Sequence, residues 1–172
     1  MVLVETVNWI LSLLIMLLDI GMILVGILYI FKKPRTLIIN FFKKNGLWIV
    51  FVLALLSTLG SLFFSEIAMY EPCKLCWFQR IFMYPLVIIS GIALWKKINN
   101  IVFITIPMAL IGLIISGYHY VIQFLPLVIT CSIDGTDCTT MSFLTFGYVT
   151  IPMMAFTAFL AIIISSCLYA KK

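Results

Sequence analysis

The sequence predicts an all-α integral membrane protein, with a bundle of four transmembrane helices preceded by one extra N-terminal transmembrane helix. Hydrophobic residues make up 65% of the 172 residues and charged residues only 10%, which is far from the composition of a soluble domain. The apolar residues form five long runs separated by short polar stretches. The basic residues lie between these runs rather than along one face, so we expect contact with membrane lipid and no nucleic-acid partner.

The first apolar run covers residues 9–31 and is long enough for a helix that crosses the hydrocarbon core. Glu5 precedes it and three basic residues follow it, which is the reverse of a secretory signal peptide. We therefore interpret residues 1–46 as a retained transmembrane helix with a basic cytoplasmic connector. Asp19 lies inside this run, where a carboxylate needs a partner or a proton, and the sequence assigns it no role.

The rest of the chain, residues 47–172, contains the predicted four-helix domain. Ser57, Gly60 and Ser61 form a small-residue face that we expect to serve helix packing. Residues 139–150 are too apolar for a solvated loop and too short to span, so they predict a short interfacial helix in the second outer loop. The four remaining apolar runs cover residues 47–64, 77–95, 101–121 and 151–169.

The basic residues are distributed unequally between the two sides that five alternating spans would define. Of eleven lysines and arginines, only Lys74 and Arg80 fall on the side of the cysteine-bearing loops. The positive-inside rule then predicts a multi-pass protein of the cell membrane, with its N-terminus outside, its C-terminus cytoplasmic and both cysteine pairs extracytoplasmic. The nine residues on the other side are Lys32, Lys33, Arg35, Lys43, Lys44, Lys96, Lys97, Lys171 and Lys172.

Four of the five cysteines form two pairs in the outer loops. Cys73 and Cys76 are a C-x-x-C pair at the start of the third run, and Cys131 and Cys138 lie in the second outer loop. An oxidising compartment lets disulfides form and persist there. The fifth, Cys167, lies near the opposite end of the last run, and we expect it to be an inert buried thiol.

Three interpretations of the outer pairs compete: a zinc site, structural disulfides and a redox pair. Arg80 would add unwanted positive charge beside a metal, so we predict no metal site. A disulfide that closes a two-residue gap constrains little chain, which disfavours a purely structural role for Cys73 and Cys76. Cys76 would lie in the first turn of a helix with Arg80 at i+4, and both features favour its thiolate. We therefore favour a redox pair.

These motifs together resemble the DsbB family of quinone-linked membrane disulfide oxidoreductases. The short spacing of the second pair is most similar to the BdbC-type members of Gram-positive bacteria. The resemblance covers residues 47–172, and the helix before them departs from the four-helix family pattern. The residues that carry it are Cys73-Lys-Leu-Cys76-Trp-Phe-Gln79-Arg80, Cys131 with Cys138, and Tyr118-His119-Tyr120.

The resemblance implies an electron path through the two pairs, all four cysteines being catalytic. A reduced thioredoxin-like oxidase of the DsbA/BdbD type would attack the Cys131–Cys138 disulfide, most readily at Cys131. Cys138 would then attack Cys73 and leave Cys76 as the thiolate that faces the quinone. The expected function is reoxidation of that oxidase, which supports disulfide bond formation in secreted proteins.

The resemblance also implies a bound quinone, either menaquinone or ubiquinone. Arg80 would bind a quinone carbonyl, and His119 and Gln79 would contact the quinone or handle a proton. Two alternatives remain open from the residues. One is a vitamin K epoxide reductase-like enzyme, although its C-x-x-C lies late in the chain; the other is a disulfide-braced membrane subunit without redox turnover.

Overall fold

The computed structural model describes residues 2–98, 100–125 and 138–170, apart from the side chains of Lys32 and Lys33. In these residues five long helices are each long and apolar enough to cross a membrane, which confirms the predicted all-α membrane fold. A short π-helix, η1 (Phe63–Ile67), continues the second helix. The helices are α1 (Val2–Ile30), α2 (Lys32–Leu62), α3 (Lys74–Lys96), α4 (Val102–Phe124) and α5 (Ile151–Ala170).

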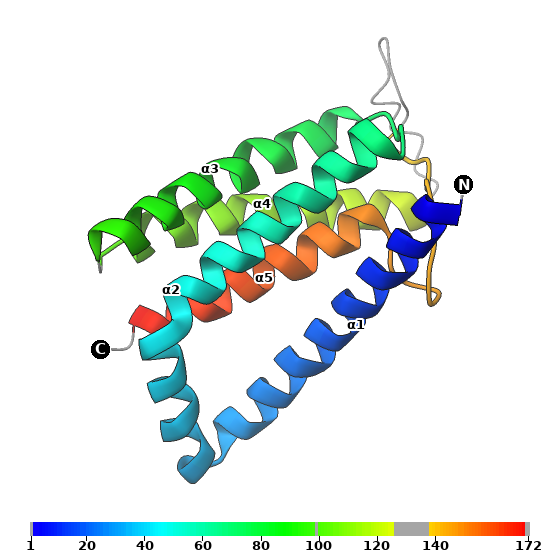
Figure 1. The fold of residues 1–172 in the computed structure, drawn as a ribbon. Helices are drawn as coiled ribbons and strands as arrows, with labels where there is room; N and C mark the ends of the chain where they lie inside the picture. Colours follow the sequence, from blue (N-terminus) through cyan, green and yellow to red (C-terminus); the bar gives the residue numbers. More distant parts are fainter. Residues whose placement is uncertain (1, 99, 126–137, 171–172) are drawn as a thin grey trace.

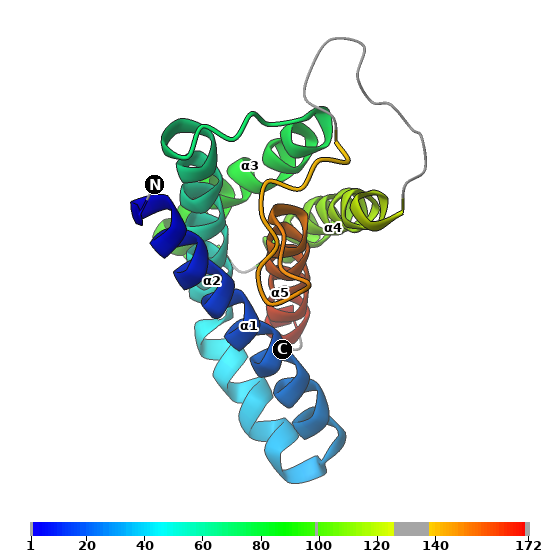
Figure 2. The ribbon, with the colours of Figure 1, turned by 90° about the vertical axis from the view of Figure 1, so that its right-hand side faces the viewer.

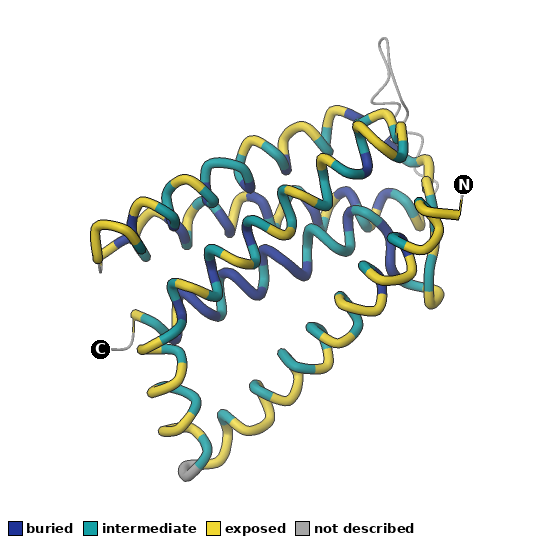
Figure 3. Tube along the Cα trace, viewed as in Figure 1, coloured by how far each residue is buried: buried dark blue, intermediate teal, exposed yellow. Residues whose placement is uncertain are grey.

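Helices α2 to α5 form the bundle, and α1 lies outside it. Helix α2 packs against α3 and α5, and α4 packs against the same two helices, so the four close into a ring. Helix α1 packs mainly against α2 and α5, and its C-terminal part diverges from the bundle (Figures 1 and 2). Buried residues accordingly gather on the bundle helices, while α1 is mostly exposed (Figure 3).

The core of the bundle depends on small residues that let the helices approach closely. Phe159 on α5 is fully buried and its ring lies against Gly112 on α4, where a Cβ atom would overlap the ring. Leu86 on α3 and Ala54 on α2 belong to the same buried cluster as Phe159. Lipid supplies no hydrophobic drive between helices, so such close packing is a main source of bundle stability.

The basic connector predicted between the first two spans is helical. Only Phe31, in an extended conformation, separates α1 from α2. Pro34 does not prevent this, because the first turn of a helix tolerates proline. The 31 residues of α2 correspond to about 46 Å, more than the roughly 30 Å of the hydrocarbon core. Part of α2 must therefore extend beyond the membrane, and Figure 1 shows that its first part runs in a different direction from the rest.

The short interfacial helix predicted at residues 139–150 is absent, and that prediction was wrong. Thr145 and Val149 instead pair as an isolated antiparallel bridge around a tight turn. Phe146 and Gly147 both have positive φ, 54° and 77°, which closes a turn and is incompatible with a right-handed helix. The apolar content of the segment did not indicate its backbone conformation, and Met141, Leu144 and Phe146 are exposed.

Cys167 is exposed on α5, contrary to the expectation of a buried thiol. Its neighbours Ser165, Ser166 and Leu168 are the residues that α5 turns toward the bundle. In a helix, adjacent positions point about 100° apart, so burial of these three directs Cys167 outward. In this membrane protein an outward position on a span faces lipid.

The two ends of the bundle differ in chemistry. The start of α3, the end of α4 and the start of α5 lie at the same end as the N-terminus (Figure 1). Cys73 and Cys76 are at that end, whereas Lys96 and Lys97 close α3 at the other. The charge separation read from the sequence is therefore also a separation in space. Which end faces the cytoplasm stays a prediction from the positive-inside rule.

Replacing Gly112 by alanine should destabilise the bundle, because the new Cβ overlaps the Phe159 ring. Overpacking of this kind costs about 1–3 kcal/mol in free energy of unfolding. The measurement is denaturant unfolding in mixed micelles. Gly21→Ala on α1 is the control, since no atom lies within 4 Å of its Cβ position. Equal stability of the two variants would contradict the close packing of α4 on α5.

Candidate functional site

Cys73 and Cys76 lie together at the N-terminus of α3. Cys73 is the N-cap residue, with an extended backbone, and Cys76 is in the first helical turn. Their sulfur atoms are 3.3 Å apart and both thiols are free. A disulfide requires about 2.05 Å between the sulfurs, so the structure holds the dithiol form. The start of α3 therefore holds the two sulfur atoms of the C-x-x-C pair close enough to interconvert between dithiol and disulfide.

The two thiols have different roles in their shared hydrogen bond. The Cys73 thiol donates to the Cys76 sulfur. This hydrogen bond, followed by burial, raises the pKa of Cys73 to about 12, although His119 acts in the opposite direction. Cys73 therefore keeps its proton at neutral pH. Cys76 is the acceptor, which is the role that a thiolate takes in such a pair.

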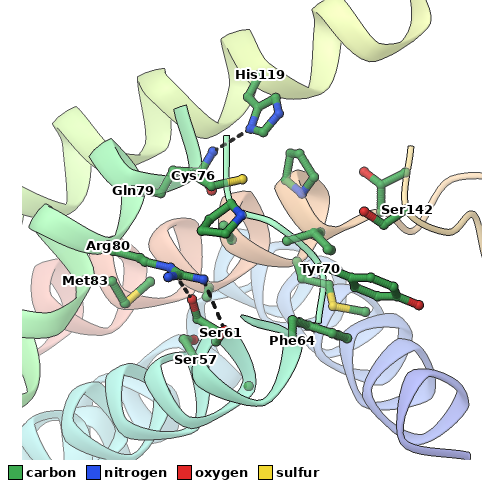
Figure 4. A pocket seen from close by; sticks show the side chains of 18 of the residues that line it. Ser57, Ser61, Phe64, Tyr70, Cys76, Gln79, Arg80, Met83, His119 and Ser142 are labelled. Carbon is green, nitrogen blue, oxygen red and sulfur yellow. Dashed lines mark hydrogen bonds between the residues drawn. The ribbon is translucent and has the colours of Figure 1, made fainter. Parts of the chain in front are cut away.

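His119 connects the pair to two other elements. It lies on α4 and is only 2% exposed. The side-chain amide of Gln79 is 3.1 Å from Nδ1, while Nε2 is 3.2 Å from the Cys138 carbonyl oxygen and 3.7 Å from the Cys73 sulfur. If the Gln79 amide nitrogen donates to Nδ1, Nε2 carries the hydrogen and donates to the Cys138 carbonyl. Figure 4 shows Gln79 and His119 facing each other above Cys76.

Arg80 is held by α2. Its Nε donates to Ser61 Oγ at 3.0 Å and its Nη2 donates to the Ser61 carbonyl oxygen at 3.3 Å (Figure 4). The Tyr84 hydroxyl donates to Ser61 Oγ at 3.3 Å. The guanidinium also lies 5.2 Å from the centre of the Trp77 ring. Among the described residues, the hydrogen bonds of Arg80 use only Nε and Nη2, which leaves the Nη1 hydrogens for a ligand.

Neither Ser61 nor Tyr84 was predicted from the sequence as a partner of Arg80. Ser61 was interpreted by size alone, as part of a packing face. A usable signal was present, because Ser61 lies near the end of the second apolar run, close to the depth at which Arg80 lies near the start of the third. A buried guanidinium needs acceptors at its own depth in the membrane.

The second cysteine pair is only partly described. Cys138 is buried and packs in one cluster with Cys73 and Ile122. Cys131 lies outside the described residues, so the structure places only one member of the predicted Cys131–Cys138 pair. Of the seven site residues read from the sequence, the other six lie at one end of the bundle: Cys73, Cys76, Gln79, Arg80, His119 and Cys138.

A cavity of about 220 Å³ opens beside these residues. Cys76, Arg80 and Ser61 are among its polar lining residues, and most of the remaining lining is aliphatic or aromatic. Apolar walls with a few convergent polar groups are typical of sites for small organic ligands. The cavity suits a flat ring with hydrogen-bond acceptors that reach Arg80.

The same side chains are also compatible with a metal ion. The ligand atoms of Cys73, Cys76 and His119 lie within 4.8 Å of one another, and two thiolates with an imidazole can bind zinc. Geometry alone therefore allows both a redox dithiol and a three-ligand metal centre. The predicted absence of a metal stays a prediction.

The pH dependence of the alkylation rate of Cys73 in the reduced protein should reflect the raised pKa of this thiol. Only the thiolate reacts, so the Cys73 rate should stay low at pH 8 and rise as the pH approaches about 12. In Cys76→Ala, loss of the hydrogen-bond acceptor should move this profile to lower pH. Iodoacetamide labelling followed by peptide mass spectrometry measures both. A Cys73 profile with a midpoint near 9 in both proteins would contradict the shared hydrogen bond.

Comparison with known proteins decides the family. Residues 43–169 match the family described as disulfide bond formation protein DsbB. Disulfide bond formation protein C of Bacillus subtilis is 45% identical over 124 residues, which cover 71% of this chain and 90% of that protein. Probable disulfide formation protein C of Halalkalibacterium halodurans is 46% identical over 129 residues, which cover 74% and 92%. No solved structure matches. The chain therefore belongs to the DsbB family of disulfide bond formation proteins.

Proposed function

We propose that this multi-pass disulfide oxidoreductase reoxidises an extracytoplasmic thioredoxin-like oxidase of the DsbA/BdbD type and passes the electrons to a membrane quinone. One observation carries the proposal. Cys73, Cys76 and Arg80 line the same apolar cavity, and the sulfur atoms of Cys73 and Cys76 are 3.3 Å apart. A thiolate, a cation and an apolar ring site thus meet at one end of the bundle.

The proposed reaction balances over two electrons and two protons. The partner dithiol becomes a disulfide, and its electrons leave through the cysteines of this chain. A bound quinone supplies the oxidant, taking up two electrons and two protons to become the quinol. No net change remains in the cysteines of this chain after one turnover.

The exchange steps are thiolate attacks on disulfide sulfurs. A partner thiolate attacks Cys131, breaks its bond to Cys138 and forms a mixed disulfide. The freed Cys138 attacks Cys73 of an oxidised Cys73–Cys76 pair and releases the Cys76 thiolate. The second partner thiol then displaces Cys131, so the partner leaves oxidised, and Cys131 attacks Cys138 to restore its disulfide and free Cys73. The role of Cys131 rests on the family resemblance. Burial of Cys138 in one cluster with Cys73 supports the attack of Cys138 on Cys73.

The residues of the cavity fit a quinone. A quinone is a flat ring with two carbonyl acceptors and a long apolar tail, and the cavity offers apolar walls beside a cation. Arg80 would donate to one carbonyl through Nη1 while Ser61 holds its other nitrogens. A cation fixed in this position also stabilises negative charge on an oxygen. Menaquinone and ubiquinone both meet this description.

His119 and Gln79 are proposed to stabilise Cys73 when it becomes a thiolate. His119 Nε2 lies 3.7 Å from the Cys73 sulfur, close enough for its N–H to donate to that sulfur after a small adjustment. Gln79, 3.1 Å from Nδ1, would hold the ring in position. Their role is therefore to position a hydrogen-bond donor at the thiols.

The proposal extends to the arrangement in the cell membrane. Residues 47–172 would be the oxidoreductase domain, and residues 1–46 an added helix with its basic connector. The cysteine-bearing end would face outside, since Lys96 and Lys97 lie at the opposite end of α3. A secreted thiol oxidase could then reach the second pair directly.

Quinone reduction by the purified protein tests this function. With a reduced thioredoxin-like partner and menaquinone, the wild type should turn over, and Cys76→Ala should lose at least a thousandfold because no thiolate faces the cavity. Absorbance of the quinone measures the rate. Stable oxidation of all outer cysteines in the wild type, with no turnover, would instead establish a disulfide-braced subunit without redox activity.

Ser61→Ala should weaken quinone reduction because Arg80 Nε loses its side-chain acceptor on α2 and only the bond from Nη2 to the backbone carbonyl remains. Loss of a hydrogen bond to a charged group is worth about 1.5–3 kcal/mol, so kcat/KM for the quinone should fall roughly tenfold or more. Ser90→Ala is the matched control, because the Ser90 hydroxyl donates to backbone carbonyls of its own helix α3 and Ser90 lies outside the cavity lining. Equal rates for the two variants would show that Arg80 does not depend on the Ser61 hydroxyl.

A further inference from the structure

Helix α1 contributes to the cavity although it lies outside the region that defines the family. The family match begins at residue 43, after α1 has ended at Ile30. Nevertheless four aliphatic residues of α1 line the same cavity as Cys76 and Arg80. They are Leu11, Leu14, Ile15 and Leu18. Their spacing of three and four residues places them on one face of the helix.

Helix α1 is attached to the bundle at specific points. The Asp19 carboxylate accepts hydrogen bonds from the Thr157 hydroxyl at 3.0 Å and from the Tyr148 hydroxyl at 3.3 Å. Nearer the N-terminus, the Trp9 ring packs edge-on against Phe146, with ring centres 5.1 Å apart. These contacts hold the cavity-facing side of α1 from both ends. Asp19, to which the sequence assigned no role, is thus an anchor between α1, α5 and the segment before α5.

Such anchors are needed because apolar contact does not bind an apolar helix in lipid. Most of α1 is exposed, including Leu17 at 54% and Leu24 at 53%. Lipid tails are as apolar as these side chains, so polar contacts and close packing decide where the helix rests. The hydrogen bonds of Asp19 therefore keep α1 over the cavity instead of leaving that side open to lipid.

We propose that α1 forms one side wall of the quinone cavity and that it retains quinones through apolar contacts with their tails. The inference rests on the proposed function and deepens it. The aliphatic face of α1 contacts the tail, while Arg80 and Cys76 stand at the ring. Filling the cavity from the α1 side lowers the affinity for long-tailed quinones and leaves the chemistry at the thiols unchanged.

The experiment compares two tryptophan substitutions on α1 in the full-length protein. Leu18→Trp fills the cavity side, and Leu17→Trp adds the same volume on the lipid side. Each is assayed with a long-tailed menaquinone and with menadione, which has the same ring and no tail. We expect Leu18→Trp to raise KM for the long-tailed quinone at least fivefold, with kcat and the menadione kinetics unchanged. Leu17→Trp should match the wild type with both.

A second measurement does not depend on turnover. The quinone that stays bound through purification is extracted and quantified per mole of protein. Leu18→Trp should retain less than a third of the wild-type amount. Asp19→Ala, which removes both anchors at that point without adding volume, should also lose quinone, and it keeps the test valid if the tryptophan variant does not fold.

The outcomes separate the two proposals. The role of α1 would be overturned, with quinone reduction intact, if two quantities were equal in Leu18→Trp, Leu17→Trp and Asp19→Ala. They are the ratio of KM for the long-tailed quinone to KM for menadione, and the quinone content. A wild type that binds and reduces no quinone would instead overturn the proposed function, and the role of α1 with it. Equal effects on menadione and on the long-tailed quinone would reduce α1 to a structural support and so contradict tail recognition.

Discussion

The site depends on where a guanidinium finds its hydrogen bonds inside an apolar bundle. Arg80 lies on α3, and the atoms that accept its hydrogen bonds belong to Ser61 near the end of α2. In a membrane such a group must be satisfied by protein, so this contact fixes the end of α2 and the start of α3 relative to each other. Cys76, one turn before Arg80, takes its position beside the cavity from the same constraint.

The start of α3 combines covalent chemistry with an unequal distribution of protons. Cys73 holds its proton with a pKa raised to about 12, and Cys76 accepts the hydrogen bond. His119, from α4, meets both Cys73 and the Cys138 backbone, so it joins the first pair to the loop of the second. The arrangement is suited to passing electrons between sulfur atoms, which agrees with membership of a disulfide bond formation family.

Helix α1 shows how an added span can be integrated into an existing bundle. Its apolar surface does not favour contact with the bundle over contact with lipid. The hydrogen bonds that Asp19 accepts from Thr157 and Tyr148 attach it to the bundle. Once anchored, α1 turns a row of aliphatic residues toward a cavity bounded by residues of the family region. A carboxylate that is costly in a lone span thus becomes the contact that positions the span.

The sequence by itself determined what local pattern can encode. Run length defined five spans, and the i+4 spacing put Arg80 one turn beyond Cys76. Only the tertiary structure decided that Ser61 holds Arg80, that Gln79 meets His119 and that α1 borders the cavity. It also replaced the expected helix at residues 139–150 with a turn. The reason is physical: length and periodicity are properties of one segment, whereas a hydrogen-bond partner or a cavity wall depends on which helices become neighbours, and five apolar spans of similar composition do not specify that order.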